Sequence, residues 1–225
     1  MKAVILAAGK GRRMLPLTLT IPKPLLRIGN KTILDHIFDA FPEEIDQVII
    51  VVGYLKKKIQ QHLGIKYQGR TIRYVVQDIL DGSATALLCC QDFFLPKEKF
   101  LLVYGDELPT HEEFVDCLQH QYSWLCSPSH DPRQSGIAML SNDQQILEVI
   151  EKPENPVSNL SAAGIMVVDS YIFNYKLIQH RNGEYYLTSL MNQFVADHKV
   201  HAVLGSARPS FISPDEVEKL HSQYL

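Results

Sequence analysis

The first half of the chain alternates short apolar runs with segments whose apolar residues recur every three or four positions. The uninterrupted runs are typical of strands buried on both faces, whereas the recurring positions predict helices with one apolar face. Strands are predicted over residues 2–7, 47–52, 71–76 and 100–104, and helices over residues 31–41, 56–63 and 83–93. This order predicts an α/β fold: a Rossmann-like, doubly wound, mostly parallel sheet with helices on both faces.

The second half has a more mixed pattern. Strands are predicted over residues 135–140, 146–151, 163–168 and 200–204, and helices over residues 170–180, 186–197 and 214–222. We find neither an internal repeat nor a linker, so residues 1–225 are expected to form a single domain. Ligands of mostly parallel sheets bind beyond the carboxyl ends of the strands. Among other positions, that rule points to the residues that follow the first strand and the strand at 100–104.

Composition and charge exclude several classes of function. Of the 225 residues, 46% are hydrophobic and 21% are charged, and the net charge is −3. A soluble globular protein without a broad cationic surface for nucleic acid is therefore expected. No run approaches the roughly 20 apolar residues that cross a membrane, and no secretion signal is recognisable, which favours the cytoplasm. The four cysteines, at positions 89, 90, 117 and 126, lack metal-site spacing, and the adjacent Cys89 and Cys90 are expected to be reduced core residues.

A glycine-rich basic loop follows the first predicted strand. Gly9 and Gly11 permit a tight turn whose N–H groups can surround an anion, and Lys10, Arg12 and Arg13 add positive charge. A triphosphate suits such a loop. The spacing matches neither a P-loop nor a dinucleotide fingerprint. A structural turn with solvated basic side chains would explain the loop taken alone.

The next segment makes the interpretation specific. Lys23 stands between Pro22 and Pro24, which restrict its backbone to a stiff, extended form. Leu-Ala-Ala-Gly-Lys-Gly-Arg-Arg-Met at residues 6–14, Pro-Leu-Thr at 16–18 and Pro-Lys-Pro-Leu at 22–25 together resemble the sugar-1-phosphate nucleotidylyltransferase family. The likeness is to its thymidylyl- and uridylyltransferases for glucose 1-phosphate, in a short form without a C-terminal extension. It implies the GT-A-like nucleotidyltransferase fold.

The resemblance assigns the nucleotide to residues of the first part of the chain, about 1–110. In the family, a glutamine five residues before a glycine recognises a pyrimidine base, and Gln77 and Gly82 have this spacing. Gly82 would let the base lie close to the backbone, and Ser83 keeps a hydroxyl where the family has threonine. Taken alone, Ser83 is a plausible helix cap. The implied nucleotide-binding residues are Leu6, Ala7, Ala8, Gly9, Lys10, Gly11, Arg12, Arg13, Gln77, Gly82 and Ser83.

The resemblance also implies a magnesium ion. Asp106 matches the family's strand-end aspartate that holds Mg²⁺; alone, it would be read as a helix cap. Many members carry a second metal-binding aspartate near the C-terminus, but the corresponding position here is Ser210. Asp215 is off register, so a shifted alignment, help from Glu107, binding by Asp106 alone, or weakened activity all stay open.

The sugar phosphate is assigned to the second part, about residues 111–225, together with Lys23. Glu151 and Lys152 match a Glu-Lys-Pro motif in which the glutamate binds sugar hydroxyls and the lysine binds the phosphate. Gly136, Asn159 and Gly164 match segments that line the sugar site. Each match is weak alone, but their order and spacing support one another.

The implied reaction is attack of a sugar 1-phosphate on the α-phosphorus of a nucleoside triphosphate, giving a nucleoside diphosphate sugar and pyrophosphate. Arg13, Lys23 and Asp106 are the catalytic candidates, and UTP or dTTP is favoured over GTP. The expected partners are these small molecules, without nucleic acid or membrane, and a homo-oligomer is possible. Two alternatives remain: a catalytically weak homologue that binds nucleotide sugars as a regulator, and transfer to a non-sugar phosphate such as phosphocholine.

Overall fold

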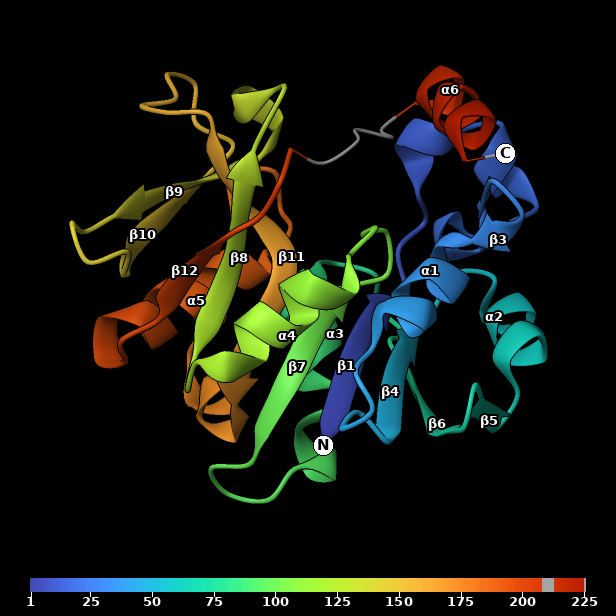
Figure 1. The fold of residues 1–225 in the computed structure, drawn as a ribbon, viewed down its shortest axis with the longest axis horizontal. Coiled ribbons are helices and arrows are strands. Elements are labelled where there is room, and N and C mark those ends of the chain that lie inside the picture. The colour runs from blue at the N-terminus through green and yellow to red at the C-terminus, as the bar shows by residue number, and fades with distance from the viewer. Residues whose placement is uncertain (208–212, 225) are drawn as a thin grey trace.

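Ten strands form one continuous sheet in the computed structural model, which describes residues 1–207 and 213–224 (Figure 1). The sheet runs in the order β10 (Ile146–Glu151), β9 (Gly136–Leu140), β11 (Leu160–Asp169), β7 (Lys99–Tyr104), β1 (Lys2–Ala7), β4 (Gln47–Val52), β6 (Arg70–Val76) and β5 (Lys66–Tyr67). Beyond this path, β8 (Ser123–Pro128) pairs with β11, and β12 (His201–Leu204) pairs with β8. A separate two-stranded sheet joins β2 (Arg27–Ile28) to β3 (Lys31–Thr32).

The character of the sheet changes between β7 and β11. The four neighbouring strands β7, β1, β4 and β6 are parallel, whereas β11 runs antiparallel to β7, with Ile165 opposite Val103. The parallel strands end together at Ala7, Val52, Val76 and Tyr104. Their carboxyl ends therefore form one edge at which the loops that follow them meet.

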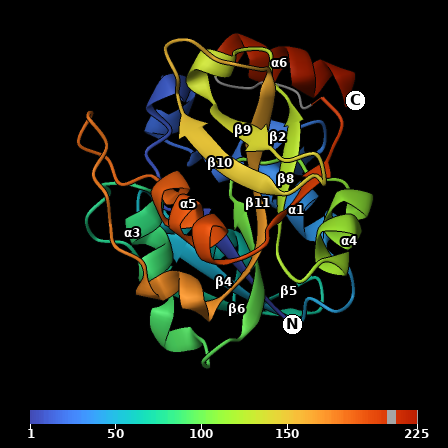
Figure 2. The same ribbon diagram turned by 90° about the vertical axis from the view of Figure 1, so that its left-hand side faces the viewer.

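Apolar residues on both faces of the central strands explain why helices cover both sides. Ile5, Ile50 and Val103 lie in one apolar cluster, and their chain neighbours Val4, Ile49 and Leu102 lie in the other. The first cluster includes residues of α1 (Ile33–Ala40), α2 (Lys56–Leu63), α4 (His111–Gln119) and α6 (Pro214–Gln223). The second includes residues of α3 (Ser83–Leu88) and α5 (Leu187–Asp197), which lie across the sheet from α4 (Figure 2). The predicted α/β fold is confirmed.

The structure corrects two predicted helices. A 3₁₀ helix spans only Ser170–Asn174, and residues 175–180 are not helical. The Gln193 side chain of α5 bonds the backbone N–H and carbonyl of Lys176, replacing the partners that a helix would supply. The helix predicted over 83–93 ends at Leu88 and is followed by a separate 3₁₀ helix, Gln91–Phe93.

Helix α4 and strand β8 are among the elements that the sequence pattern did not predict. Helix α4 begins with a capping box in which Thr110 and Glu113 each bond the other's backbone N–H. Strand β8 is almost entirely buried and lies between β11 and β12. Of the four cysteines, Cys89 is exposed rather than buried in the core, and the other three are buried.

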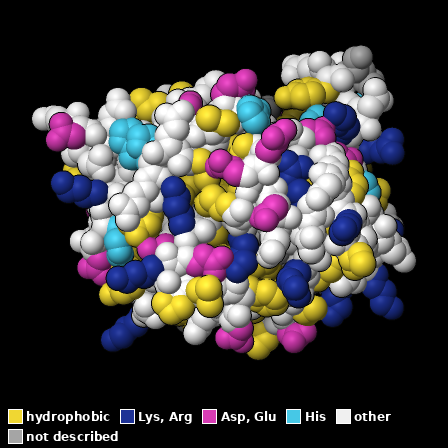
Figure 3. Space-filling view, turned by 60° about the horizontal axis from the view of Figure 1, so that its bottom comes forward, with side chains coloured by type: hydrophobic (Ala, Val, Ile, Leu, Met, Phe, Trp, Pro, Cys, Tyr) yellow, Lys and Arg dark blue, Asp and Glu magenta, His cyan; other side chains and the backbone are white. Residues whose placement is uncertain are grey.

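The molecular surface mixes charges of both signs. On the face that Figure 3 brings forward, described Lys and Arg side chains alternate with Asp and Glu side chains and with scattered apolar groups. None of the described helices combines the length and the apolar character that a membrane crossing requires.

Candidate active site

The glycine-rich loop leaves β1 at the edge where the parallel strands end. Gly11 adopts the left-handed conformation (φ 59°), and Arg12–Met14 form a 3₁₀ turn anchored by buried Met14. A Cβ atom added at Gly11 would lie 3.1 Å from Thr18 and 3.2 Å from Lys23, so a larger residue would push these segments apart. Within the described residues, the backbone N–H groups of residues 9–13 donate no hydrogen bond to the protein. They are available to an anion, as predicted for a phosphate-binding loop.

Lys23 and Asp106 meet beside this loop although 83 positions separate them. Lys23 Nζ lies 2.6 Å from Asp106 Oδ2, and the lysine side chain is 12% exposed. Lys23 itself begins a 3₁₀ turn, so only the preceding Pro22 has the extended backbone that the sequence predicted. Asp106 follows Gly105, whose N–H donates to the carbonyl of Leu6 and so ties the end of β7 to β1.

The charges around Asp106 keep it ionised. Burial alone would raise the pKa of this carboxyl, but the nearby charge of Lys23, its hydrogen bond and the charge of Arg13 outweigh that effect and lower the pKa. Asp106 does not cap α4, because Thr110 has that role. An ionised carboxylate beside the glycine-rich loop has the chemistry of a Mg²⁺ ligand, a role that substrate phosphates commonly share.

Gln77 is held in one orientation at the end of β6. Its side chain is buried, and Nε2 donates to the carbonyl of Gly82 and to Thr85 Oγ1, both at 3.0 Å. These acceptors direct the amide nitrogen inward and leave Oε1 without a donor among the described residues. The arrangement offers a hydrogen-bond acceptor of fixed direction.

Gly82 and Ser83 have structural surroundings that the sequence did not predict. Gly82 has φ +150°, and a Cβ atom there would overlap the backbone carbonyl of Tyr185. The close approach that requires glycine is therefore made by the chain itself, through Tyr185. Ser83 is not the cap of α3, because Gly82 holds that position. The Ser83 hydroxyl instead accepts a hydrogen bond from the N–H of Leu187 at 2.9 Å.

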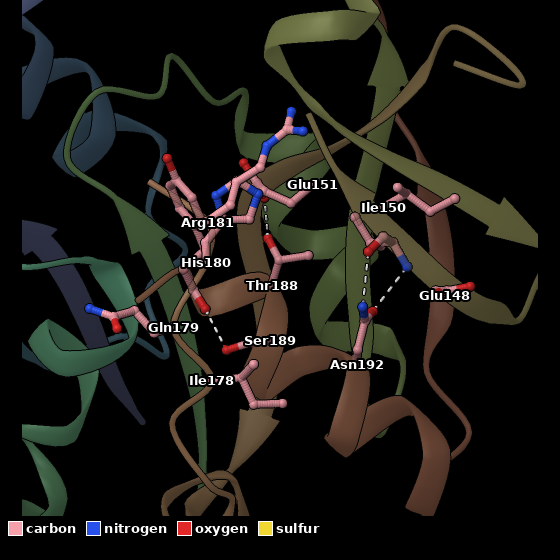
Figure 4. A pocket seen from close by; sticks show the side chains of 12 residues that line it. Glu148, Ile150, Glu151, Ile178, Gln179, His180, Arg181, Thr188, Ser189 and Asn192 are labelled. Carbon is pink, nitrogen blue, oxygen red and sulfur yellow. Dashed lines mark hydrogen bonds between the residues drawn. The ribbon is translucent and has the colours of Figure 1, made fainter. Parts of the chain in front are cut away.

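Glu151 stands at the end of β10, opposite Gly136 on β9. A Cβ atom at Gly136 would lie 3.4 Å from Glu151 Oε2, so glycine leaves room for this carboxylate. The hydroxyl of Thr188 donates to Glu151 Oε2 at 2.5 Å, a contact visible in Figure 4. The next residue, Lys152, has a positive φ of 45°, and its Nζ lies 2.7 Å from the hydroxyl oxygen of Tyr186.

A hollow of about 400 Å³ opens beside Glu151 (Figure 4). It lies between the end of β10, the segment before α5 and the first turns of α5. Its lining residues are Glu148, Val149, Ile150, Glu151, Ile178, Gln179, His180, Arg181, Tyr186, Thr188, Ser189 and Asn192. The mixture of carboxylate, hydroxyl and amide groups suits a hydroxyl-rich ligand.

Gly164 and Asn159 have different outcomes. Gly164 packs against the ring of Tyr104, where no side chain could fit, and its N–H donates to Glu107 Oε1 at 2.6 Å. Asn159 is exposed, and its backbone carbonyl accepts from Ser129. In the described part of the chain, the Asn159 side chain forms no hydrogen bond with another candidate residue. The role of Asn159 at the sugar site therefore stays a prediction.

The candidates for a second metal ligand have different surroundings. Ser210 lies outside the described residues. Asp215 is exposed in the first turn of α6, and one carboxylate oxygen of Glu107 accepts from Gly164. Among residues 1–207 and 213–224, no group of three or more His, Cys, Asp or Glu side chains could hold a metal ion.

Sequence reasoning missed Tyr186 and Thr188, which contact the Glu151–Lys152 pair. These contacts join residues 34 and 37 positions apart, so a pattern of neighbouring residues could not predict them. The only available signal was the polar segment that precedes α5.

Comparison with known proteins identifies a family and several relatives. The family model described as Nucleotidyl transferase matches residues 2–207. The UTP–glucose-1-phosphate uridylyltransferase AglF of Haloferax volcanii is 34% identical over 210 residues, covering 87% of this chain and 84% of that protein. The bifunctional protein GlmU of Methanocaldococcus jannaschii is 33% identical over 205 residues, covering 90% of this chain and 49% of GlmU. The chain thus spans about half the length of its GlmU relatives.

Solved structures agree with these relatives. A Bacillus anthracis protein assigned as a glucose-1-phosphate thymidylyltransferase, in complex with a sucrose, has a TM-score of 0.87 at 26% identity, covering 100% of this chain and 95% of that one. A UDP-glucose pyrophosphorylase complexed with UDP-glucose has a TM-score of 0.85 at 20% identity, covering 99% and 97%, and shows the shared fold alone.

Proposed function

The chain belongs to the nucleotidyl transferase family, as its motifs predicted, and on that premise we propose that it transfers a nucleotidyl group from UTP or dTTP to a sugar 1-phosphate. The observation that carries the proposal is the Lys23–Asp106 pair at 2.6 Å, beside the N–H groups of residues 9–13, which donate no hydrogen bond within the described chain. The name of the 34% identical relative AglF supports glucose 1-phosphate as the first acceptor to test.

The reaction places two anions against each other. An oxygen of the sugar phosphate attacks the α-phosphorus, and the bond from that phosphorus to the pyrophosphate oxygen breaks. The attacking oxygen is already ionised near pH 7, so positioning and charge neutralisation supply the catalysis. Arg13 and the N–H groups of residues 9–13 would hold the β- and γ-phosphates and stabilise the leaving pyrophosphate. Lys23 would neutralise charge where the two substrates meet.

Magnesium fits the observed surroundings of Asp106. When bound there, Mg²⁺ supplies positive charge that offsets the triphosphate. Lys23 and Arg13 prepare this site in the protein itself, because they keep the Asp106 carboxylate ionised. Glu151 and Lys152 would bind the sugar and its phosphate, and the division into a nucleotide part (about 1–110) and a sugar-phosphate part (about 111–225) follows from this assignment.

The fixed amide of Gln77 supports the choice of base. Its Oε1 atom is an acceptor, and the imide N–H of uracil or thymine is a matching donor, whereas cytosine has an acceptor at the same ring position. UTP and dTTP are therefore preferred to CTP. We also place the reaction in the cytoplasm, where nucleoside triphosphates are available.

The test is pyrophosphate release with Mg²⁺ from UTP, dTTP, GTP, CTP and ATP, each against a panel of sugar 1-phosphates and phosphocholine. Release with UTP or dTTP and one sugar 1-phosphate, abolished by EDTA, is the expected result. Pyrophosphate release with phosphocholine alone would mean that the acceptor is phosphocholine and not a sugar 1-phosphate. Nucleotide binding by calorimetry without any release would instead support the alternative of a regulatory protein that binds nucleotide sugars.

A further inference from the structure

The hydroxyl of Tyr186 has two donors against it. Lys152 Nζ lies 2.7 Å from this oxygen and 4.4 Å from the ring centroid, and Asn182 Nδ2 also donates to it at 2.7 Å. The orientation of the Asn182 amide is fixed, because its Oδ1 accepts from the backbone N–H of Glu184. Both neighbours of the hydroxyl are therefore donors.

The proton of this hydroxyl has no acceptor in the part of the chain that the structure describes. An ammonium group has no lone pair to offer, and neither has an amide nitrogen. The Tyr186 O–H and the remaining Lys152 N–H groups are thus donors held side by side. Two adjacent donors, one of them positively charged, suit the oxygens of a phosphate.

The position of Tyr186 between the two substrate sites strengthens this interpretation. Tyr185 bonds the backbone on both sides of Gly82, donating to Asp81 and accepting from Ala84. The residue before Tyr186 therefore contacts residues 81–84, the segment proposed to bind the base. Two residues after Tyr186, Thr188 bonds the Glu151 carboxylate. The Tyr186 hydroxyl therefore lies where the phosphate that links the nucleotide to the sugar is expected.

We propose that Tyr186 is a substrate-binding residue whose O–H donates to a phosphate oxygen of the sugar 1-phosphate, next to Lys152. The proposal rests on the proposed function, because it takes the phosphate of that reaction as the ligand. Tyr186 contacts the ground state and the transition state alike, so it governs the KM for the sugar phosphate more than kcat.

The test replaces Tyr186→Phe, which keeps the ring and removes only the hydroxyl. With UTP and glucose 1-phosphate, the KM for glucose 1-phosphate should rise about ten-fold, as expected for one hydrogen bond to a charged group. The KM for UTP and the thermal midpoint should stay unchanged. Tyr171→Phe is the matched control, because the Tyr171 hydroxyl forms no hydrogen bond in the described chain and its ring packs against Tyr175 and His198.

A second pair of variants separates direct contact from an effect through Lys152. In a Lys152→Met background, Tyr186→Phe should still lower kcat/KM for glucose 1-phosphate several-fold. If the hydroxyl has no effect in that background, Tyr186 only orients Lys152, and the proposed contact is wrong. If the unsubstituted protein is active and Tyr186→Phe alone leaves the KM for glucose 1-phosphate unchanged, the proposed contact is also wrong. An inactive parent across the whole substrate panel contradicts the proposed function instead.

Discussion

At the scale of single residues, the Lys23–Asp106 pair makes the sharpest prediction. Lys23→Ala should lower kcat by at least about a hundred-fold, because in the proposed reaction the lost cation neutralises charge where the two phosphates approach each other. The free energy of unfolding should change far less, since the Asp106 partner is 38% exposed and can be solvated. Steady-state pyrophosphate release and urea unfolding measure the two effects. Lys31→Ala removes an exposed lysine paired with Asp39 and is the control. A near-normal kcat for Lys23→Ala would remove this residue from the mechanism.

The lowered pKa of Asp106 also fixes a pH dependence. A depressed carboxyl pKa keeps the group ionised at every pH above its unfolded value of about 4. The stabilisation that Asp106 contributes is lost only as the pH falls below that value. The acid limb of kcat/KM for the sugar phosphate should therefore lie near about pH 6, where a phosphate monoester takes up its second proton. A limb near pH 4 would mean that Asp106 controls it.

The amide of Gln77 predicts a change in base preference. Gln77→Ala should reduce the ratio of kcat/KM for UTP over CTP about ten-fold, because the Oε1 acceptor that is proposed to select against cytosine is lost. Competition between the two nucleotides measures the ratio. Gln91→Ala, at an exposed position after α3, controls for the loss of a glutamine side chain. An unchanged ratio would mean that another group reads the base.

At the scale of elements, the contact between Gly82 and Tyr185 joins the start of α3 to the segment that precedes α5. Gly82→Ala should destabilise the fold by about 2–4 kcal/mol, because both the positive φ and the overlap with the Tyr185 carbonyl oppose a Cβ atom. Gly69→Ala separates these causes, since Gly69 also has a positive φ of +81° but open space around it. Its cost should be about 1 kcal/mol. Equal costs in urea unfolding would show that the contact with Tyr185 adds nothing.

The same elements show what the sequence could predict. Strands β1, β4 and β7 follow from uninterrupted apolar runs, because burial on both faces leaves no other pattern. Residues 175–180 were wrongly predicted as helical, because the Gln193 side chain satisfies Lys176 and local periodicity does not register such a contact. The motifs predicted Lys23 and Asp106 as site residues, and the structure brings these two side chains together. The contact between Tyr186 and Lys152 could not be predicted, because it joins residues 34 positions apart that only the fold brings together.

At the scale of the whole molecule, the continuous sheet predicts one cooperative unfolding unit. Strand β7 pairs with β1 on one edge and with β11 on the other, so the two parts of the chain share hydrogen bonds through it. Trp124 is the single tryptophan and lies buried on β8, with its indole N–H bonded to the carbonyl of Ala163. Its fluorescence therefore reports the second part, whereas far-ultraviolet circular dichroism reports the entire chain.

Urea unfolding followed by these two signals should give coincident transitions with the same midpoint and slope. Unfolding of the antiparallel part alone would expose the β11-facing edge of β7 and the apolar face that Ile165 and Val103 share, so a half-folded state is costly. Val103→Ala, at the shared register, should shift both transitions together by about 1–3 kcal/mol. A tryptophan transition that precedes the loss of secondary structure would instead show two independently folding parts, and the proposed sugar-phosphate site could then unfold while the proposed nucleotide site stays folded.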